Sequence, residues 1–253
     1  MMLQAEHVTV RYGELAAVSD VSLRIGEGEW WTVIGPNGAG KSTLAGALSR
    51  SLPWEGTITL NGRDIRTCSS AEYARSVGVL NQNHDAVYGF TVEEVVSLGG
   101  YARQRGFFRK GDPEGDEKIA EALALTGLEE MRNRNMLTLS GGERQRAFLA
   151  QVFCQDPEIL MLDEPANHLD LPFQKELFSL IGTWLETPGR AVVTVMHDLS
   201  LARKYGTHAL LMDRGRCVAQ GKASEVLAPG ILREVYGMDV RGWMLELLGL
   251  WKD

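Results

Sequence analysis

The sequence lacks several features that would assign it to whole classes of proteins. Only three of its 253 residues are cysteine, and Cys68, Cys154 and Cys217 form no C-x-x-C pair. Neither a disulfide framework nor a cysteine-rich metal cluster is therefore expected. No apolar run approaches the ~18 residues that span a bilayer, and residues 1–7 show neither the basic nor the long apolar segment of a signal peptide. These absences favour an ordinary globular protein of a reducing compartment.

Positive charge is also scarce relative to negative charge. The chain has 26 Lys and Arg against 33 Asp and Glu, a formal net charge of −7. This balance argues against an electrostatically driven nucleic-acid binder, so no nucleic-acid partner is expected. The basic cluster at 103–110 is interpreted as a solvated loop. The stretch 242–251 is apolar but short, and Glu246 interrupts it, so it is expected to pack against protein rather than to anchor in a membrane.

The most informative segment is the glycine-rich stretch from Gly35 to Thr43. It matches G-x-x-x-x-G-K-[ST], follows the apolar run 30–34 and precedes a potential helix at 44–48. Its glycines let backbone amides converge on an anion, and the following helix directs the positive end of its dipole toward it. Lys41 is predicted to bind the β- and γ-phosphates of a nucleotide, and Ser42 to ligate Mg²⁺. The predicted phosphate-binding residues are Gly35, Asn37, Gly38, Gly40, Lys41, Ser42 and Thr43.

The hydrophobic pattern predicts two β-containing parts around a helical one. Alternating apolar residues before position 60, followed by the Asn61-Gly62 hairpin signal, indicate a β-rich beginning. A helix is expected to begin after Thr91, and a polar loop to follow at 102–115. Further helices are predicted at 116–125, 143–153, 172–185 and 199–205, with short ones from 223 and 230. Further strands are predicted at 76–80, 159–162, 191–196, 209–212 and 217–219.

Two carboxylates follow the apolar run 159–162. A buried strand that ends in Asp163 can present a carboxylate to a phosphate-bound Mg²⁺. The adjacent Glu164 can polarise a water molecule for in-line attack. The alternative interpretation is a strand that ends in an acidic turn, but the presence of a phosphate loop upstream favours the functional one.

A second glycine pair lies in the segment Leu139–Arg146, which reads Leu-Ser-Gly-Gly-Glu-Arg-Gln-Arg. Ser140 can cap the helix that follows, with Glu143 completing a capping box. Ser140, Gly141 and Gly142 at this helix terminus also form a potential second anion site. The simpler interpretation is a capped helix after a flexible turn. That interpretation leaves a second anion site, far from the first in the sequence, unexplained.

With these motifs the chain resembles the ATP-binding cassette (ABC) ATPases, from about residue 3 to residue 240. The resemblance implies an α/β fold, namely a P-loop NTPase core with an N-terminal antiparallel β-subdomain and an inserted helical subdomain. It implies a single domain over 1–253, with the core and β-subdomain at 1–83 and 158–253. Residues 84–157 would form the helical subdomain, which carries the family signature at 139–146.

The resemblance also implies roles for individual residues. Tyr12 matches the aromatic residue that stacks on adenine, and Gln82 matches the glutamine that senses Mg²⁺. His197 matches the switch histidine that contacts the γ-phosphate, and Asp170 lies in the loop that signals across a dimer. The catalytic set implied is Lys41, Gln82, Glu164 and His197, and the Mg²⁺ ligands are Ser42, Gln82 and Asp163.

In this family two cassettes pair head to tail, and each signature contacts the γ-phosphate held by the partner's loop. The resemblance therefore implies ATP and Mg²⁺ as ligands, ATP hydrolysis coupled to transport, and a second copy of the chain as a partner. It also implies membrane-spanning permease subunits and, indirectly, a solute-binding protein. The chain would then be a peripheral protein at the cytoplasmic face of the cell membrane.

The segment 163–171, followed by Gln174, is similar to importers of iron–siderophore, haem and cobalamin complexes, as are 96–101, 197–202 and 234–240. Molybdate-type oxyanion importers share this architecture and stay open as an alternative. So does a soluble ABC ATPase of iron–sulfur cluster assembly, although that signature usually continues with two lysines and this one continues with Arg144-Gln145. Ribosome-associated relatives carry two tandem cassettes, whereas this chain has one phosphate loop and one signature.

Overall fold

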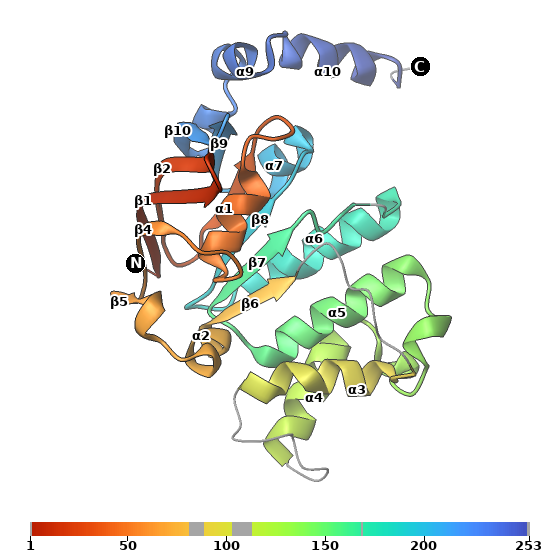
Figure 1. Ribbon diagram of the computed structural model, residues 1–253. Helices are drawn as coiled ribbons and strands as arrows, with labels where there is room; N and C mark the ends of the chain where they lie inside the picture. Colours follow the sequence, from red (N-terminus) through yellow and green to blue (C-terminus); the bar gives the residue numbers. More distant parts are fainter. Residues whose placement is uncertain (1, 81–88, 103–112, 168, 252–253) are drawn as a thin grey trace.

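The computed structural model describes residues 2–80, 89–102, 113–167 and 169–251, which form two sheets and their covering helices (Figure 1). The smaller sheet is antiparallel, with the strand order β2-β1-β4-β5. Its strands are β1 (Leu3–Tyr12), β2 (Leu15–Ile25), β4 (Glu55–Leu60) and β5 (Arg63–Asp64). The predicted hairpin is confirmed, because β4 and β5 pair across Asn61-Gly62.

The larger sheet has the order β10-β9-β3-β8-β7-β6 and is parallel except for β10. Its strands are β3 (Trp30–Ile34), β6 (Val77–Leu80), β7 (Ile159–Asp163), β8 (Ala191–Val195), β9 (His208–Asp213) and β10 (Arg216–Lys222). Every residue of β3 and β8 is buried, as expected for parallel strands covered on both faces. The predicted buried parallel strand at 159–162 is likewise confirmed.

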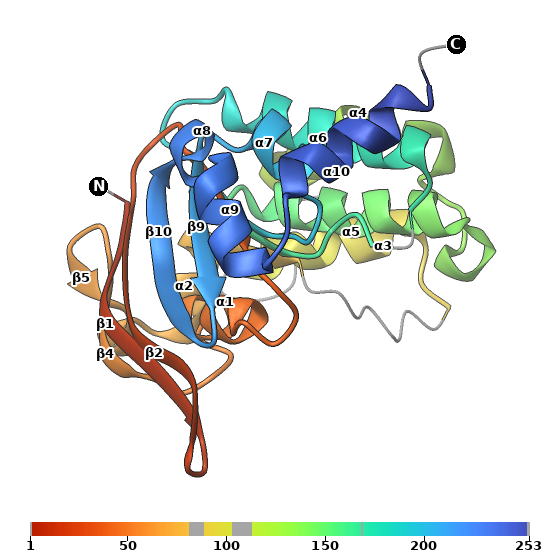
Figure 2. The same ribbon diagram turned by 90° about the horizontal axis from the view of Figure 1, so that it is seen from above.

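Helices lie on both faces of the larger sheet and form a separate group between β6 and β7. The α-helices are α1 (Lys41–Leu48), α2 (Ser70–Ser76), α3 (Val92–Ser97), α4 (Pro113–Leu125), α5 (Gly141–Gln155), α6 (Leu171–Leu185), α7 (Leu199–Tyr205), α8 (Ala223–Val226), α9 (Pro229–Tyr236) and α10 (Val240–Gly249). Short 3-10 turns occupy Ile65–Thr67, Leu98–Ala102, Glu129–Met131 and Met136–Thr138. Figure 2 shows the antiparallel sheet on one side of the molecule and α3 and α5 on the other.

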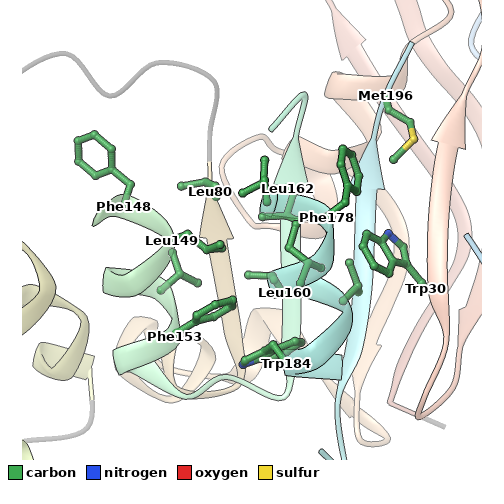
Figure 3. Packing of buried hydrophobic residues seen from close by; sticks show 14 of the residues in the cluster. Trp30, Leu80, Phe148, Leu149, Phe153, Leu160, Leu162, Phe178, Trp184 and Met196 are labelled. Atoms are coloured by element: carbon green, nitrogen blue, oxygen red, sulfur yellow. The ribbon is translucent and has the colours of Figure 1, made fainter. Parts of the chain in front are cut away.

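The consecutive residues Trp30 and Trp31 face opposite sides of the larger sheet because side chains alternate along a strand. Trp30 lies in the core formed with the helices, where its ring stacks on Phe178 of α6 and its indole N–H donates to Thr194 Oγ1 at 2.8 Å. Trp31 lies in the core shared with α1 and the antiparallel sheet. Figure 3 shows Trp30 and Phe178 side by side in the first of these cores, with Met196 nearby.

The helix predictions failed in two places. Most of the loop predicted at 102–115, residues 103–112, lies outside the described residues, and α4 begins at Pro113 rather than at 116. Proline suits the first turn of a helix because its fixed φ is helical and it has no N–H to leave unpaired. Helix α2 was not predicted at all, although Ser69 and Glu72 form a complete capping box at its start.

The C-terminal apolar stretch at 242–251 was expected to pack against protein, and the structure bears this out only in part. Met244 packs against the main core, but Trp243, Leu245 and Leu248 of α10 are exposed, as is Trp251 beyond it. Figure 1 places α9 and α10 at the end of the molecule opposite α3 and α4. None of the described helices is both long enough and apolar enough to cross a bilayer.

Candidate functional site

The glycine-rich loop joins β3 to α1, as its motif predicts, and two of its glycines cannot be replaced. Gly35 has φ +145°, and a Cβ there would lie 2.1 Å from the Met212 carbonyl oxygen. Gly40 has φ +94°, and its Cβ would lie 2.4 Å from the Ala17 carbonyl oxygen. The loop passes so close to neighbouring strands before it turns into α1 that only glycine, which has no Cβ, fits at these two positions with a positive φ.

Lys41, the first residue of α1, points back into this loop. Its side chain is buried, and Nζ donates to the carbonyl oxygens of Gly35 at 3.0 Å and Pro36 at 2.9 Å. Burial lowers the pKa of Lys41, while Glu164 and Asp163 act in the opposite direction by favouring its charge. An ammonium group held at a glycine-rich loop next to a helix N-terminus provides positive charge for an anionic phosphate.

Asp163, the last residue of β7, faces the beginning of α1. Its Oδ1 accepts a hydrogen bond of 3.1 Å from Ser42 Oγ. Burial raises the pKa of Asp163, and the bond from Ser42 lowers it in part. A hydroxyl and a carboxylate oxygen at this distance are ligands that suit Mg²⁺, a hard cation. The third predicted ligand, Gln82, lies outside the described residues.

Glu164 follows Asp163 in a left-handed conformation, with φ +51°. Its backbone N–H donates to Val195 O at 3.0 Å, which fixes the residue at the end of the neighbouring strand β8. His197, two residues beyond β8, lies with Nε2 2.6 Å from Glu164 Oε1. Because β7 and β8 are adjacent and parallel, their carboxyl ends bring the glutamate and histidine together.

These side chains surround one pocket of about 280 Å³ at the carboxyl edge of the larger sheet. Glu164 and His197 face the phosphate loop across it, although they follow the loop by more than 120 residues in the sequence. Its lining consists of Asn37, Gly38, Gly40, Lys41, Ser42, Thr43, Glu164 and His197. The fold thus gathers most of the predicted phosphate-binding residues, and three of the four predicted catalytic residues, Lys41, Glu164 and His197, line this pocket.

Other predicted site residues lie outside this pocket. Tyr12, at the end of β1, has an exposed side chain and is not among the residues that line the pocket. Asp170 caps α6, where its carboxylate accepts from Phe173 N at 3.2 Å.

Ser140 begins α5 through the predicted capping box. Its hydroxyl accepts from Glu143 N at 3.3 Å, its own N–H donates to Glu143 Oε2 at 2.7 Å, and these bonds lower the pKa of Glu143. Gly141 is exposed, and a Cβ there would meet no other atom within 4 Å. A Cβ on Gly142 would lie 2.6 Å from the Phe173 ring. None of these three residues lines the pocket, so the signature helix presents a separate open surface.

Sequence reasoning assigned no role to three polar residues that hold the loop after Glu164. The Asn167 side-chain amide donates to Glu164 Oε2. Gln145 Nε2 of α5 donates to Pro165 O at 3.2 Å. Gln174 Nε2 of α6 bonds the carbonyl oxygens of two other loop residues, 166 and 169. The motif contained Asn167 and Gln174, but spacing alone does not say which side chain meets which backbone oxygen.

A phosphate loop, two carboxylates at the end of a buried strand and a histidine just beyond the neighbouring strand define a P-loop nucleotide-binding protein. Residues 18–167 match the family model described as ABC transporter, which is more than half of the chain. The chain therefore belongs to the ABC transporter family. It is an ATP-binding subunit of this family, an ATPase that drives transport, and the predicted ABC ATPase fold is confirmed.

Known relatives agree over nearly the whole chain. It is 37% identical over 239 residues to the iron(3+)-hydroxamate import ATP-binding protein of Bacillus subtilis (strain 168), covering 94% of this chain and 88% of the relative. It is 39% identical over 246 residues to the hemin import ATP-binding protein of Pseudomonas entomophila (strain L48), covering 94% of each. The expected resemblance to importers of iron–siderophore and haem complexes is thereby confirmed.

A solved structure adds the same fold in a dimeric form. A bacterial ABC transporter cassette, described as dimeric, superimposes with a TM-score of 0.77 at 27% identity. The match covers 88% of this chain and 99% of that cassette.

Proposed function

We propose that this chain powers a membrane importer of metal chelates, such as iron–siderophore or haem complexes. The observation that carries the proposal is the identity of 37–39% to an iron(3+)-hydroxamate and a hemin import ATP-binding protein, over 94% of the chain. The pattern at 163–171 and Gln174 supports the same branch. Cobalamin is a further member of this chemical class.

The phosphate loop and Lys41 bind the phosphates of ATP, with Lys41 exchanging its present carbonyl partners for the β- and γ-phosphates. Tyr12 stacks on the adenine. Ser42, Asp163 and Gln82 hold Mg²⁺, and the contact between Ser42 and Asp163 supports this assignment. Bound Mg²⁺ would neutralise charge on the β- and γ-phosphate oxygens.

Glu164 and His197 act on the attacking water. Glu164 orients the water and accepts its proton as the oxygen attacks the γ-phosphorus, while the bond to the leaving ADP breaks. His197 donates to the γ-phosphate and fixes its geometry relative to Glu164. Their 2.6 Å contact at the edge of the phosphate pocket supports this division of roles.

A second copy of the chain completes the site. In a head-to-tail dimer, Ser140, Gly141 and Gly142 of one copy contact the γ-phosphate held by the other, and Asp170 lies at the junction. The open surface at Gly141 and the dimeric related cassette support this arrangement. We further propose one ABC ATPase domain, with a nucleotide-binding core at 1–83 and 158–253 and a helical subdomain at 84–157.

Permease subunits are the remaining direct partners, and a solute-binding protein acts through them. The helical subdomain docks a permease loop, and the exposed side chains of Leu98 and Tyr101 on this subdomain supply apolar surface for it. The chain then works as a peripheral protein at the cytoplasmic face of the cell membrane. An alternative is a soluble ABC ATPase of iron–sulfur cluster assembly.

An affinity pull-down of the tagged full chain from detergent-solubilised native membranes tests the proposal, with partners identified by mass. We expect a polytopic membrane subunit, and its binding protein should take up a metal chelate. Recovery of assembly-scaffold proteins alone, with no polytopic subunit, would refute the importer proposal in favour of the iron–sulfur alternative.

A further inference from the structure

Glu164 is held from two sides. His197 Nε2 contacts Oε1 from the end of β8, and the Asn167 side-chain amide donates to Oε2. Asn167 lies only three residues after Glu164, and a turn joins them, since Asn167 N donates to Glu164 O at 3.2 Å. The glutamate therefore has one carboxylate oxygen held by a group from a neighbouring strand and the other by its own loop.

The loop that carries Asn167 is fixed by two helices. Gln145 of α5 binds the Pro165 carbonyl oxygen at 3.2 Å. Gln174 of α6 binds those of Ala166 at 3.3 Å and Leu169 at 3.2 Å. Because three of its backbone carbonyl oxygens accept hydrogen bonds from helices, the loop has little freedom to move Asn167 away from Glu164.

Asn167 contacts Glu164 from outside the pocket at the phosphate loop. Glu164 and His197 line both the phosphate pocket and a second pocket of about 130 Å³. Asn167 and Gln174 line only the second one. Asn167 therefore contacts the carboxylate without being part of the phosphate-binding surface.

We propose that Asn167 is a positioning residue for ATP hydrolysis, which orients the Glu164 carboxylate toward the attacking water. A rotating carboxylate would lose the alignment that in-line attack requires, and small misplacements of a reacting group can cost up to ~100-fold in rate. The assignment rests on the proposed role of Glu164 as the base, concerns the hydrolytic step alone and holds whichever solute the transporter carries.

Asn167→Ala and Asn167→Asp in the full chain test this assignment. The aspartate has nearly the shape of asparagine but cannot donate, and it adds a like charge beside Glu164. We expect both variants to lower kcat by about 10- to 100-fold with KM for ATP unchanged. Asn167 is exposed, so neither variant creates a buried cavity, and Tm should stay near that of the wild type.

Asn133→Asp is the matched control, since it makes the same chemical change at an exposed position outside both pockets. It should keep the wild-type rate. A fully active Asn167→Asp would overturn the proposal, because side-chain shape would then suffice. A raised KM with unchanged kcat would also overturn it, because Asn167 would then act in binding.

A double-mutant cycle shows whether Asn167 acts through Glu164. Single-turnover hydrolysis is measured with Asn167→Ala in the wild-type and Glu164→Gln backgrounds. Residues that act as a unit give strongly non-additive losses, so Asn167→Ala should change the residual rate of Glu164→Gln by less than about 2-fold. An equal loss in both backgrounds would contradict the proposal, even if ATP hydrolysis itself behaves as expected.

Discussion

At the scale of single residues, the site depends on groups whose backbone or burial is unusual. Glu164 takes a left-handed conformation that non-glycine residues seldom adopt. Such conformations persist when surrounding contacts fix them, and here the bond to Val195 O and the contacts of both carboxylate oxygens do so. Lys41 keeps an ammonium group in a buried position, which its two carbonyl acceptors stabilise.

Glu164→Gln removes the proposed base but keeps the size and shape of the side chain. We expect hydrolysis to fall by about 10²- to 10⁴-fold, the usual cost of losing a positioned base, while ATP still binds. Steady-state ATPase assays and equilibrium ATP binding measure the two effects. Gel filtration with ATP and Mg²⁺ should then show a stable dimer. A variant that binds ATP yet elutes as a monomer would contradict the head-to-tail closure.

At the scale of secondary-structure elements, helix caps decide where the functional loops end. Ser140, Asp170 and Asp198 each accept backbone N–H groups at the first turn of a helix. Asp170 follows the loop after Glu164, and Asp198 follows His197, so the hydrogen bonds of these two caps fix the ends of segments that carry site residues. Helix α2 shows the same device outside the site, through Ser69 and Glu72.

The cap of α2 makes one contribution to stability dependent on pH. Bonds from Ser69, with Arg63 nearby, lower the pKa of Glu72 from 4.5 to about 2. The folded state therefore favours the carboxylate. This contribution is complete above the unfolded pKa near 4.5 and is lost as the pH falls toward 2.

Glu72→Gln keeps a capping oxygen but removes the charge. We expect a small fall in Tm at pH 7, and the difference from wild type should shrink as the pH falls below 4.5. Thermal unfolding across the pH range measures it. Glu130→Gln, at an exposed position, is the control for the change in net charge. A Tm difference that stays constant with pH would contradict this explanation.

At the scale of the whole molecule, the two surfaces to which we assign a role in ATP hydrolysis lie apart. The phosphate pocket takes its residues from the loop after β3 and from the ends of β7 and β8, whereas the signature begins α5. The proposed head-to-tail dimer would bring the two surfaces together between copies. Because such a dimer has two-fold symmetry, it would contain two equivalent sites.

Mixing two inactive variants tests this arrangement. Lys41→Ala disables the phosphate loop, and Gly141→Leu places a side chain on the open signature surface without an internal clash. Each variant alone should lose at least about 100-fold in ATPase rate. Their mixture should regain activity, because one site of each mixed dimer combines the intact loop of one copy with the intact signature of the other. Activity that stays at the sum of the separate variants would exclude a shared site.

The sequence by itself determined the class of protein and most of its elements. The phosphate loop and the buried strand before Asp163 are local patterns, because glycine conformations and apolar runs act within a few residues. The helix cap formed by Ser140 and Glu143 was likewise predicted from the sequence. The start of α4 and the whole of α2 were missed because their short or polar sequences carry weak periodicity.

Only the tertiary structure decided which of these groups meet. Glu164 and His197 are brought together by the adjacency of β7 and β8, which sheet topology sets and no local pattern contains. The bond from Gln145 of α5 to the Pro165 carbonyl oxygen depends on the packing of a helix against a strand end, whereas the contact of Asn167 with Glu164 lies within one turn. Local sequence specifies residue types and element boundaries, whereas hydrogen bonds between distant segments arise only when long-range packing fixes their positions.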